Sequence, residues 1–80
     1  MSHTQRDRAK LISRVRRIKG QLEAVERALD ARKECGEILQ LIAATRGAIN
    51  GLMGQVLEDH VRLHVLDTDD LVSVVRTYLK

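Results

Sequence analysis

A regular stripe of apolar residues is the feature that most constrains the fold of this chain. In the first third of the sequence, apolar residues recur at intervals of four and three positions, at Leu11, Val15, Ile18, Leu22, Val25 and Leu29. This spacing is typical of one face of a long amphipathic helix. The chain contains no proline to interrupt long helices. The sequence therefore predicts an all-α fold that begins with a long helix, which Ser2 or Thr4 is expected to cap.

Two more helices are predicted, so that residues 1–80 form a single three-helix domain. The second helix runs from about residue 34 to 64, with an apolar face at Ile38, Leu39, Ile42, Ile49, Leu52, Met53, Val56 and Leu57. The segments 30–34 and 66–70 break the pattern and are predicted to be connections. Thr68 or Asp69 is expected to cap a short third helix. Its apolar residues are Leu71, Val74, Val75, Tyr78 and Leu79.

The middle of the second helix is rich in small residues, namely Ala43, Ala44, Gly47, Ala48, Gly51 and Gly54. Glycines weaken an isolated helix, whereas small side chains let another backbone come close. We therefore expect this segment to be the crossing point with a partner helix. A break into two helices at Gly47 or Gly51 is the alternative.

The size of the chain favours an oligomer. A domain of 80 residues buries a modest core, and such chains often gain stability by association. No apolar run approaches the ~18 residues that span a bilayer, and the polar N-terminus is unlike a signal peptide. The single cysteine cannot form an internal disulfide. We therefore expect a cytoplasmic protein that does not contact the membrane.

Charge divides the chain into two parts. Residues 1–33 hold ten Lys and Arg against four Asp and Glu, whereas residues 34–80 hold four against seven. Scattered basic residues usually mean only a solvated helix face. A basic half beside an acidic half nevertheless favours a polyanion such as DNA as the partner of the first half.

Four side chains are candidate ligands for a soft metal ion: His3, Cys35, His60 and His64. His60 and His64 lie one helical turn apart, so they share a face and can hold one ion. Taken alone, such a pair is more often exposed and idle, and a lone cysteine is more often a small buried apolar residue. The spacing between Cys35 and the histidines decides between these interpretations.

Cys35 precedes His60 by 25 positions, which at about 100° per residue puts both on the same side of a helix. At ~1.5 Å per residue they lie roughly 37 Å apart, too far to share an ion within one chain. Two such helices packed antiparallel about a two-fold axis near position 47.5 would bring Cys35 to the partner subunit's His60. A hairpin turn near residue 32 would also place His3 beside His60 and His64.

The predicted site therefore combines His3, His60 and His64 of one chain with Cys35 of the other, twice per dimer. The amine of Ser2 would be a further donor if Met1 is removed. Three imidazoles and a thiolate suit nickel(II), cobalt(II) or zinc(II), whereas copper(I) would favour more sulfur.

Several stretches together resemble the CsoR/RcnR family of bacterial metal-sensing repressors. They are residues 14–21 (RVRRIKGQ), 34–35 (EC), 42–53 (IAATRGAINGLM) and 58–60 (EDH). The opening Ser2-His3-Thr4 and the His60/His64 pair are similar to the nickel- and cobalt-sensing branch of that family. Its copper sensors carry a second cysteine where this chain has His64, and its FrmR-type formaldehyde sensors carry a proline where it has Ser2. Many relatives also have a longer link before the third helix.

The resemblance implies an antiparallel four-helix-bundle dimer, a tetramer of two such dimers, and repression of a metal-efflux gene that nickel(II) or cobalt(II) relieves. It also implies that operator DNA contacts basic residues of the first helix, here Arg14 and Arg17 with Arg16 and Lys19. The alternatives are a formaldehyde- or electrophile-responsive repressor acting through Cys35, a zinc-responsive repressor, and a helical interaction module without an effector. An enzyme is not expected, because no carboxylate or base is placed for turnover.

Overall fold

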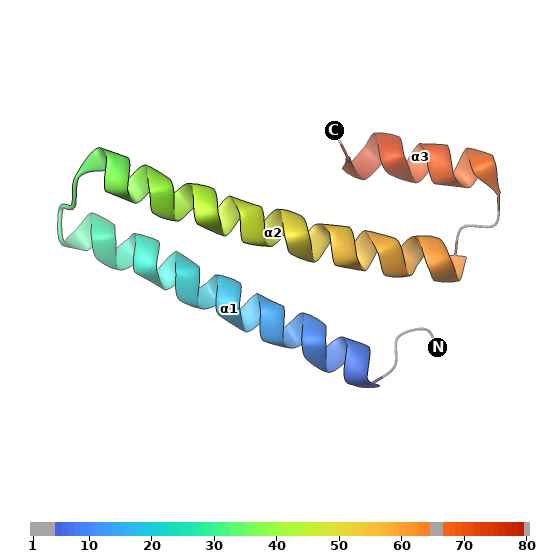
Figure 1. Ribbon diagram of the computed structural model, residues 1–80, viewed down its shortest axis with the longest axis horizontal. Coiled ribbons are helices and arrows are strands. Elements are labelled where there is room, and N and C mark those ends of the chain that lie inside the picture. Colours follow the sequence, from blue (N-terminus) through green and yellow to red (C-terminus); the bar gives the residue numbers. More distant parts are fainter. Residues whose placement is uncertain (1–4, 65–66, 80) are drawn as a thin grey trace.

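The chain folds into a helical hairpin with a third, shorter helix beside it (Figure 1). The computed structural model describes residues 5–64 and 67–79, with side chains at residues 7–62 and 67–79. Helix α1 is Gln5–Asp30, α2 is Cys35–His64 and α3 is Thr68–Tyr78. α1 and α2 run antiparallel, and α3 turns back along the side of α2 that faces away from α1. The all-α prediction is confirmed, whereas Ser2 and Thr4, the expected caps of α1, lie outside the described residues.

A Schellman motif ends α1. Arg32 has a positive φ of 56°, the left-handed conformation that this motif requires after the last turn. The Lys33 N–H donates to the Ala28 carbonyl at 3.0 Å, and the Arg32 N–H donates to the Leu29 carbonyl at 3.1 Å. These bonds satisfy carbonyls that the end of a helix otherwise leaves unpaired. The predicted connection over residues 30–34 is therefore confirmed.

α2 is one unbroken helix of 30 residues. The break considered at Gly47 or Gly51 does not occur. α1 lies beside α2 over this segment. Thr45, buried between the two helices, donates from Oγ1 to the Leu41 carbonyl at 2.8 Å.

α3 begins three residues before Leu71, the first residue of its apolar pattern. The cap is Asp67, and the expectation of Thr68 or Asp69 was wrong. Asp67 has an extended backbone (φ −152°), and its side chain accepts the Asp70 N–H at 2.9 Å. Because this carboxylate satisfies an otherwise unpaired N–H group, the helix can start at Thr68.

The three helices form a single layer. The molecule measures 50 × 29 × 11 Å, and its shortest dimension is about the diameter of one helix. Its Cα radius of gyration is 16.3 Å, against ~12 Å for a compact domain of this length. Among the described residues only Ile18, Ala28 and Thr45 are buried. One layer leaves both faces exposed, so a protomer alone has a very small core.

Candidate metal and DNA-binding sites

α2 carries an exposed seam with the alternating spacing of a coiled coil, which we call the ligand seam. Its members are Cys35, Leu39, Ile42, Arg46, Ile49, Met53, Val56 and His60, all of them exposed. Residues at intervals of four and three lie on one side of a helix. Leu39 is 58% exposed and Val56 45%, large fractions for apolar side chains in the middle of a helical hairpin. The ligand seam is therefore an exposed strip that is apolar apart from Arg46, with Cys35 and His60 at its ends. Its second half, from Ile49 to His60, also lines the groove beside α3.

α1 also carries a strip of exposed apolar side chains that runs along the helix. Val15, Leu22 and Leu29 recur every seven residues and are 42%, 51% and 57% exposed. The sequence predicted that they share one buried face with Ile18. The structure buries Ile18 and leaves these three exposed. Only part of the predicted stripe is therefore used within the hairpin.

The structure places two predicted metal ligands at opposite ends of α2. Cys35 is the first residue of the helix and is exposed, and His60 lies one turn before its end. An unbroken helix between them keeps them roughly 37 Å apart. Among the described residues, no three His, Cys, Asp or Glu side chains lie close enough to hold a metal ion. A metal site that includes both residues therefore needs a second copy of the chain.

The other two predicted ligands cannot be placed in the same detail. His64 is the last residue of α2, but its side chain lies outside the described residues, as does all of His3. His60 also lines an apolar groove of about 420 Å³ between α2 and α3, together with Tyr78 of α3. The short third helix therefore reaches the end of α2 that carries the histidines.

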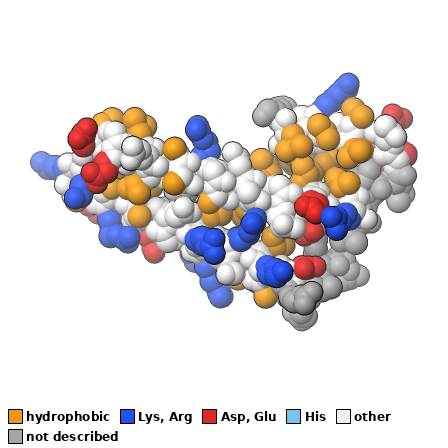
Figure 2. Space-filling model, in the orientation of Figure 1, with side chains coloured by type: hydrophobic (Ala, Val, Ile, Leu, Met, Phe, Trp, Pro, Cys, Tyr) orange, Lys and Arg blue, Asp and Glu red, His pale blue; other side chains and the backbone are white. Residues whose placement is uncertain are grey.

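The structure divides the basic residues that were predicted to bind DNA. Arg14 and Arg17 line a hollow of about 240 Å³ between α1 and α2, whereas Arg16 and Lys19 are exposed and do not line it. Figure 2 shows Lys and Arg side chains gathered over α1 and along its border with α2. Lys10 lines the next hollow with Arg14. Lys10 was not among the predicted DNA contacts, although its spacing of four from Arg14 puts both side chains on one helix face.

The small residues of α2 line the same hollow as the arginines. Gly47, Ala48 and Gly51 form its α2 side, and Arg14 Nη1 donates to the Gly51 carbonyl at 3.0 Å. Roughly 120° or more of rotation about the α2 axis separates Gly47 and Gly51 from the ligand seam. The expectation that these residues mark the crossing point with a partner helix stays a prediction. The helix that lies nearest to them is the chain's own α1.

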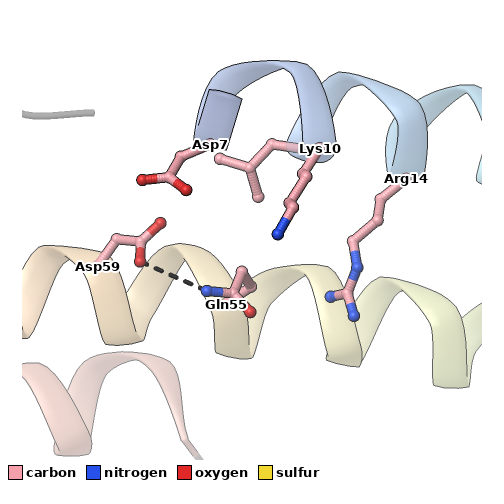
Figure 3. A pocket seen from close by; sticks show the side chains of 6 residues that line it. Asp7, Lys10, Arg14, Gln55 and Asp59 are labelled. Atoms are coloured by element: carbon pink, nitrogen blue, oxygen red, sulfur yellow. Dashed lines mark hydrogen bonds between the residues drawn. The ribbon is translucent and has the colours of Figure 1, made fainter. Parts of the chain in front are cut away.

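Towards the start of α1 the charge becomes mixed (Figure 3). The hollow there has a volume of about 270 Å³ and is lined by Asp7, Lys10, Leu11, Arg14, Gln55 and Asp59. Asp7 of α1 and Asp59 of α2 point towards one another. Gln55 Nε2 donates to Asp59 Oδ1 at 3.4 Å. Positive charge between the helices is therefore concentrated at Arg14 and Arg17, while carboxylates offset it at this end.

Comparison with known proteins adds an independent finding. Residues 7–78 match the family of metal-sensitive transcriptional repressors. A Serratia marcescens protein from the bioA 5′ region is 55% identical over 91 residues, and a homolog of the transcriptional repressor RcnR from Escherichia coli is 41% identical over 90 residues. Both alignments cover 100% of this chain and 100% of the relative.

Among solved structures, a variant of the formaldehyde-responsive regulator FrmR from Salmonella enterica serovar Typhimurium matches with a TM-score of 0.75 and 42% identity. The match covers 94% of this chain and 89% of that one. The matched family consists of transcriptional repressors, which confirms the expectation that the chain is not an enzyme. None of the described helices has the length and apolarity that a membrane crossing requires.

Proposed function

Because this chain belongs to the family of metal-sensitive transcriptional repressors, we propose that it is a repressor released from DNA by nickel(II) or cobalt(II). In this proposal the apo protein binds operator DNA as a homodimer or a pair of dimers. The metal is held by His3, His60 and His64 of one subunit and by Cys35 of the other, and its binding derepresses a metal-efflux gene. The thiol must stay reduced to bind metal, so we place the protein in the reducing cytoplasm.

The observation that carries this proposal is the symmetry of the ligand seam. When two copies of α2 pack antiparallel about a two-fold axis near position 47.5, Cys35 lies opposite the partner subunit's His60. The same register pairs Leu39 with the partner's Val56, Ile42 with the partner's Met53, and Arg46 with the partner's Ile49. The apolar side chains that are exposed in one protomer thus cover those of the other, which is how two helical hairpins form a four-helix bundle. One register therefore serves both the metal ligands and the packing.

The chemistry of the donor set supports a late first-row metal. Neutral imidazoles and a thiolate suit nickel(II), cobalt(II) and zinc(II), and a single thiolate is poor in sulfur for copper(I). These ligands must lose their protons to bind, so metal binding weakens as the pH falls. With all ligands engaged, the segment before α1 is tied to the end of α2 and to the partner's Cys35. Such a restraint on α1 changes how its arginines face DNA, and by reciprocity DNA weakens metal binding by the same factor.

Basic residues of α1 supply the proposed DNA contacts. Arg14 and Arg17 border α2, and Arg16 and Lys19 extend the positive charge along the exposed sides of α1. Contacts of this kind neutralise phosphates and release counterions, so affinity should fall steeply with salt. The chain has one aromatic residue, Tyr78, and it lies on α3. We therefore propose that the choice of operator rests largely on the shape of the DNA.

The proposal is tested by metal-dependent release of DNA. A fluorescent duplex is first selected from a random library by the reduced apo protein, and its anisotropy is then followed as nickel(II), cobalt(II) or zinc(II) is added. We expect nickel(II) or cobalt(II) to release the duplex from the wild type, and His64→Leu to abolish the response while DNA binding is kept. A duplex that stays bound at saturating concentrations of every metal would contradict the proposal.

A formaldehyde- or electrophile-responsive repressor is the second candidate. Cys35 is exposed at the first residue of α2, where its thiol is accessible to an electrophile. The identity to the formaldehyde-responsive FrmR (42%) differs by only one percentage point from that to the RcnR homolog (41%), so identity does not choose between them. The same anisotropy assay does. Release by formaldehyde that survives His64→Leu but not Cys35→Ala would favour this candidate.

A further inference from the structure

Gly47 lies in the middle of α2, where nothing within the described protomer requires a glycine. A Cβ added at Gly47 would meet no atom within 4 Å. Glycine at such a position destabilises a helix by about 1 kcal/mol relative to alanine. Gly51 lies one turn further on, and a Cβ there would come within 3.8 Å of Arg14 Nη1. Both glycines line the hollow that Arg14 and Arg17 border. The open space over Gly47 is therefore available to a partner from outside the protomer.

The chemistry of the hollow indicates what kind of partner fits. A second copy of this chain is expected on the apolar ligand seam, on a different side of α2. The hollow is lined by two arginines, an isoleucine and three small residues, with no carboxylate among them. Arginine is well suited to phosphate, because its planar guanidinium presents several N–H donors in a fixed fork. The charge and shape of the hollow therefore favour an anion that approaches close to the backbone of α2.

The hydrogen bond from Arg14 orients one side of this hollow. Arg14 Nη1 donates to the Gly51 carbonyl at 3.0 Å. A guanidinium carries five N–H donors, so this single bond fixes the side chain across the gap and leaves other donors for a phosphate. Arg14 is exposed, so the bond contributes little stability by itself. Its effect is to hold a positive group beside the open backbone of α2.

The neighbouring hollow is a poorer place for a phosphate. It shares Arg14 but is also lined by Asp7 and Asp59, whose carboxylates face one another from the two helices (Figure 3). These two carboxylates offset the positive charge of Lys10 and Arg14 in this hollow. Of the two hollows between α1 and α2, the one lined by Arg14 and Arg17 is therefore the better place for an anion.

We propose that the hollow between α1 and α2 seats one backbone phosphate of double-stranded DNA. Arg14 and Arg17 donate to its oxygens, and Gly47 and Gly51 leave the gap through which the sugar-phosphate backbone approaches α2. The proposal rests on the DNA binding proposed above and deepens it, because it makes α2 part of the DNA surface. It also gives the mid-helix glycines a role on the side of α2 that faces away from the ligand seam.

The test fills the gap without changing any charge. Gly47→Leu is compared with Gly20→Leu, which also sits in a helix where an added Cβ meets nothing within 4 Å but does not line the hollow. Apo protein is titrated into a fluorescent double-stranded DNA fragment of mixed sequence at several salt concentrations. We expect Gly47→Leu to weaken binding about tenfold or more and to lower the salt slope by about one phosphate. Gly20→Leu, which lies one turn after Arg16, should lose clearly less affinity than Gly47→Leu and should keep the wild-type salt slope.

Two further measurements keep the result decisive. Helicity by circular dichroism and the oligomeric state by sedimentation are recorded for both variants. Arg14→Lys, which keeps the charge but lacks the planar fork, should lose affinity several-fold. Wild-type affinity in Gly47→Leu or in Arg14→Lys would overturn the phosphate seat. A changed oligomeric state in Gly47→Leu would overturn it in favour of a contact between copies. Failure of the wild type and of Gly20→Leu to bind any DNA would instead overturn the proposed function.

Discussion

The two sides of α2 differ in what they offer to a partner. The ligand seam is apolar, keeps a coiled-coil spacing and ends in Cys35 and His60. The other side carries small residues and an open hollow, which Arg14 and Arg17 of α1 border. One side is suited to a second copy of the chain and the other to a polyanion. A single unbroken helix carries both sides. In the proposed dimer it would therefore link the packing of two copies on one side to the position of the arginines on the other.

The largest effect is expected from a charge placed in the ligand seam. Ile42→Glu should dissociate the proposed dimer and lower its helicity, because burying an unpaired carboxylate costs several kcal/mol and the protomer has few buried residues of its own. Metal and DNA binding should be lost with the dimer. Sedimentation and circular dichroism measure this, with the exposed Gln40→Glu as the matched control. An Ile42→Glu protein that remains a stable dimer would show that the interface lies elsewhere.

On the opposite side of α2, charge reversal should affect DNA binding and leave assembly unchanged. Arg17→Glu is expected to weaken DNA binding at least tenfold and to reduce the salt slope by about one or more phosphates. Arg16→Glu changes the net charge equally but lies outside the hollow, so its loss should be smaller. Anisotropy titrations over a range of salt concentrations measure both. Equal losses would mean that net charge governs binding, and that the hollow has no special part in it.

A smaller and more local effect is expected at α3. Asp67→Ala removes the cap that accepts the Asp70 N–H, which should destabilise α3 by about 1 kcal/mol. Tyr78 is the only aromatic residue of the chain, so its fluorescence during denaturation reports on α3. Asp69→Ala, which lacks the capping bond, should have the weaker effect of a lost helix-dipole interaction. If both variants lower the tyrosine midpoint equally, the cap assignment is wrong.

The smallest effect is expected in the turn that holds the two long helices together. Arg32→Gly should stabilise the protein by about 0.5–1 kcal/mol, because glycine adopts a positive φ without the steric penalty that arginine has. Arg32→Ala keeps the penalty and should not stabilise. Urea midpoints of the three proteins make the comparison. A destabilised Arg32→Gly would mean that the arginine side chain makes a contact stronger than this strain.

The apolar period predicted the helices, because residues at intervals of three and four lie on one side of a helix. The connection at residues 30–34 followed for the same reason. The period did not separate Ile18, which is buried, from Val15, Leu22 and Leu29, which are exposed. The spacing of the apolar residues does not indicate whether a given side of α2 packs against α1 or against a second copy of the chain. A helix rich in glycine fits closely against a second copy or against an arginine, and only the hairpin showed that Gly47 and Gly51 lie beside α1. The cap at Asp67 was missed because three adjacent polar residues offered equivalent signals.

The metal site was predicted less completely. The spacing of Cys35 and His60 places them on one side of α2, and the exposed seam between them agrees with that. The complete set of four ligands, which includes His3 and His64, remains a prediction.

The most direct test of the shared metal site is subunit mixing. Cys35→Ala and His60→Ala are purified separately, then unfolded and refolded together, and tight cobalt(II) sites with a thiolate charge-transfer band are counted. If Cys35 of one subunit joins His60 of the other, the mixed dimer has one intact site and one site that lacks both ligands. Wild-type sites should therefore appear in the mixture and in neither parent. A mixture with no sites beyond those of its parents would contradict a site shared across the two-fold axis.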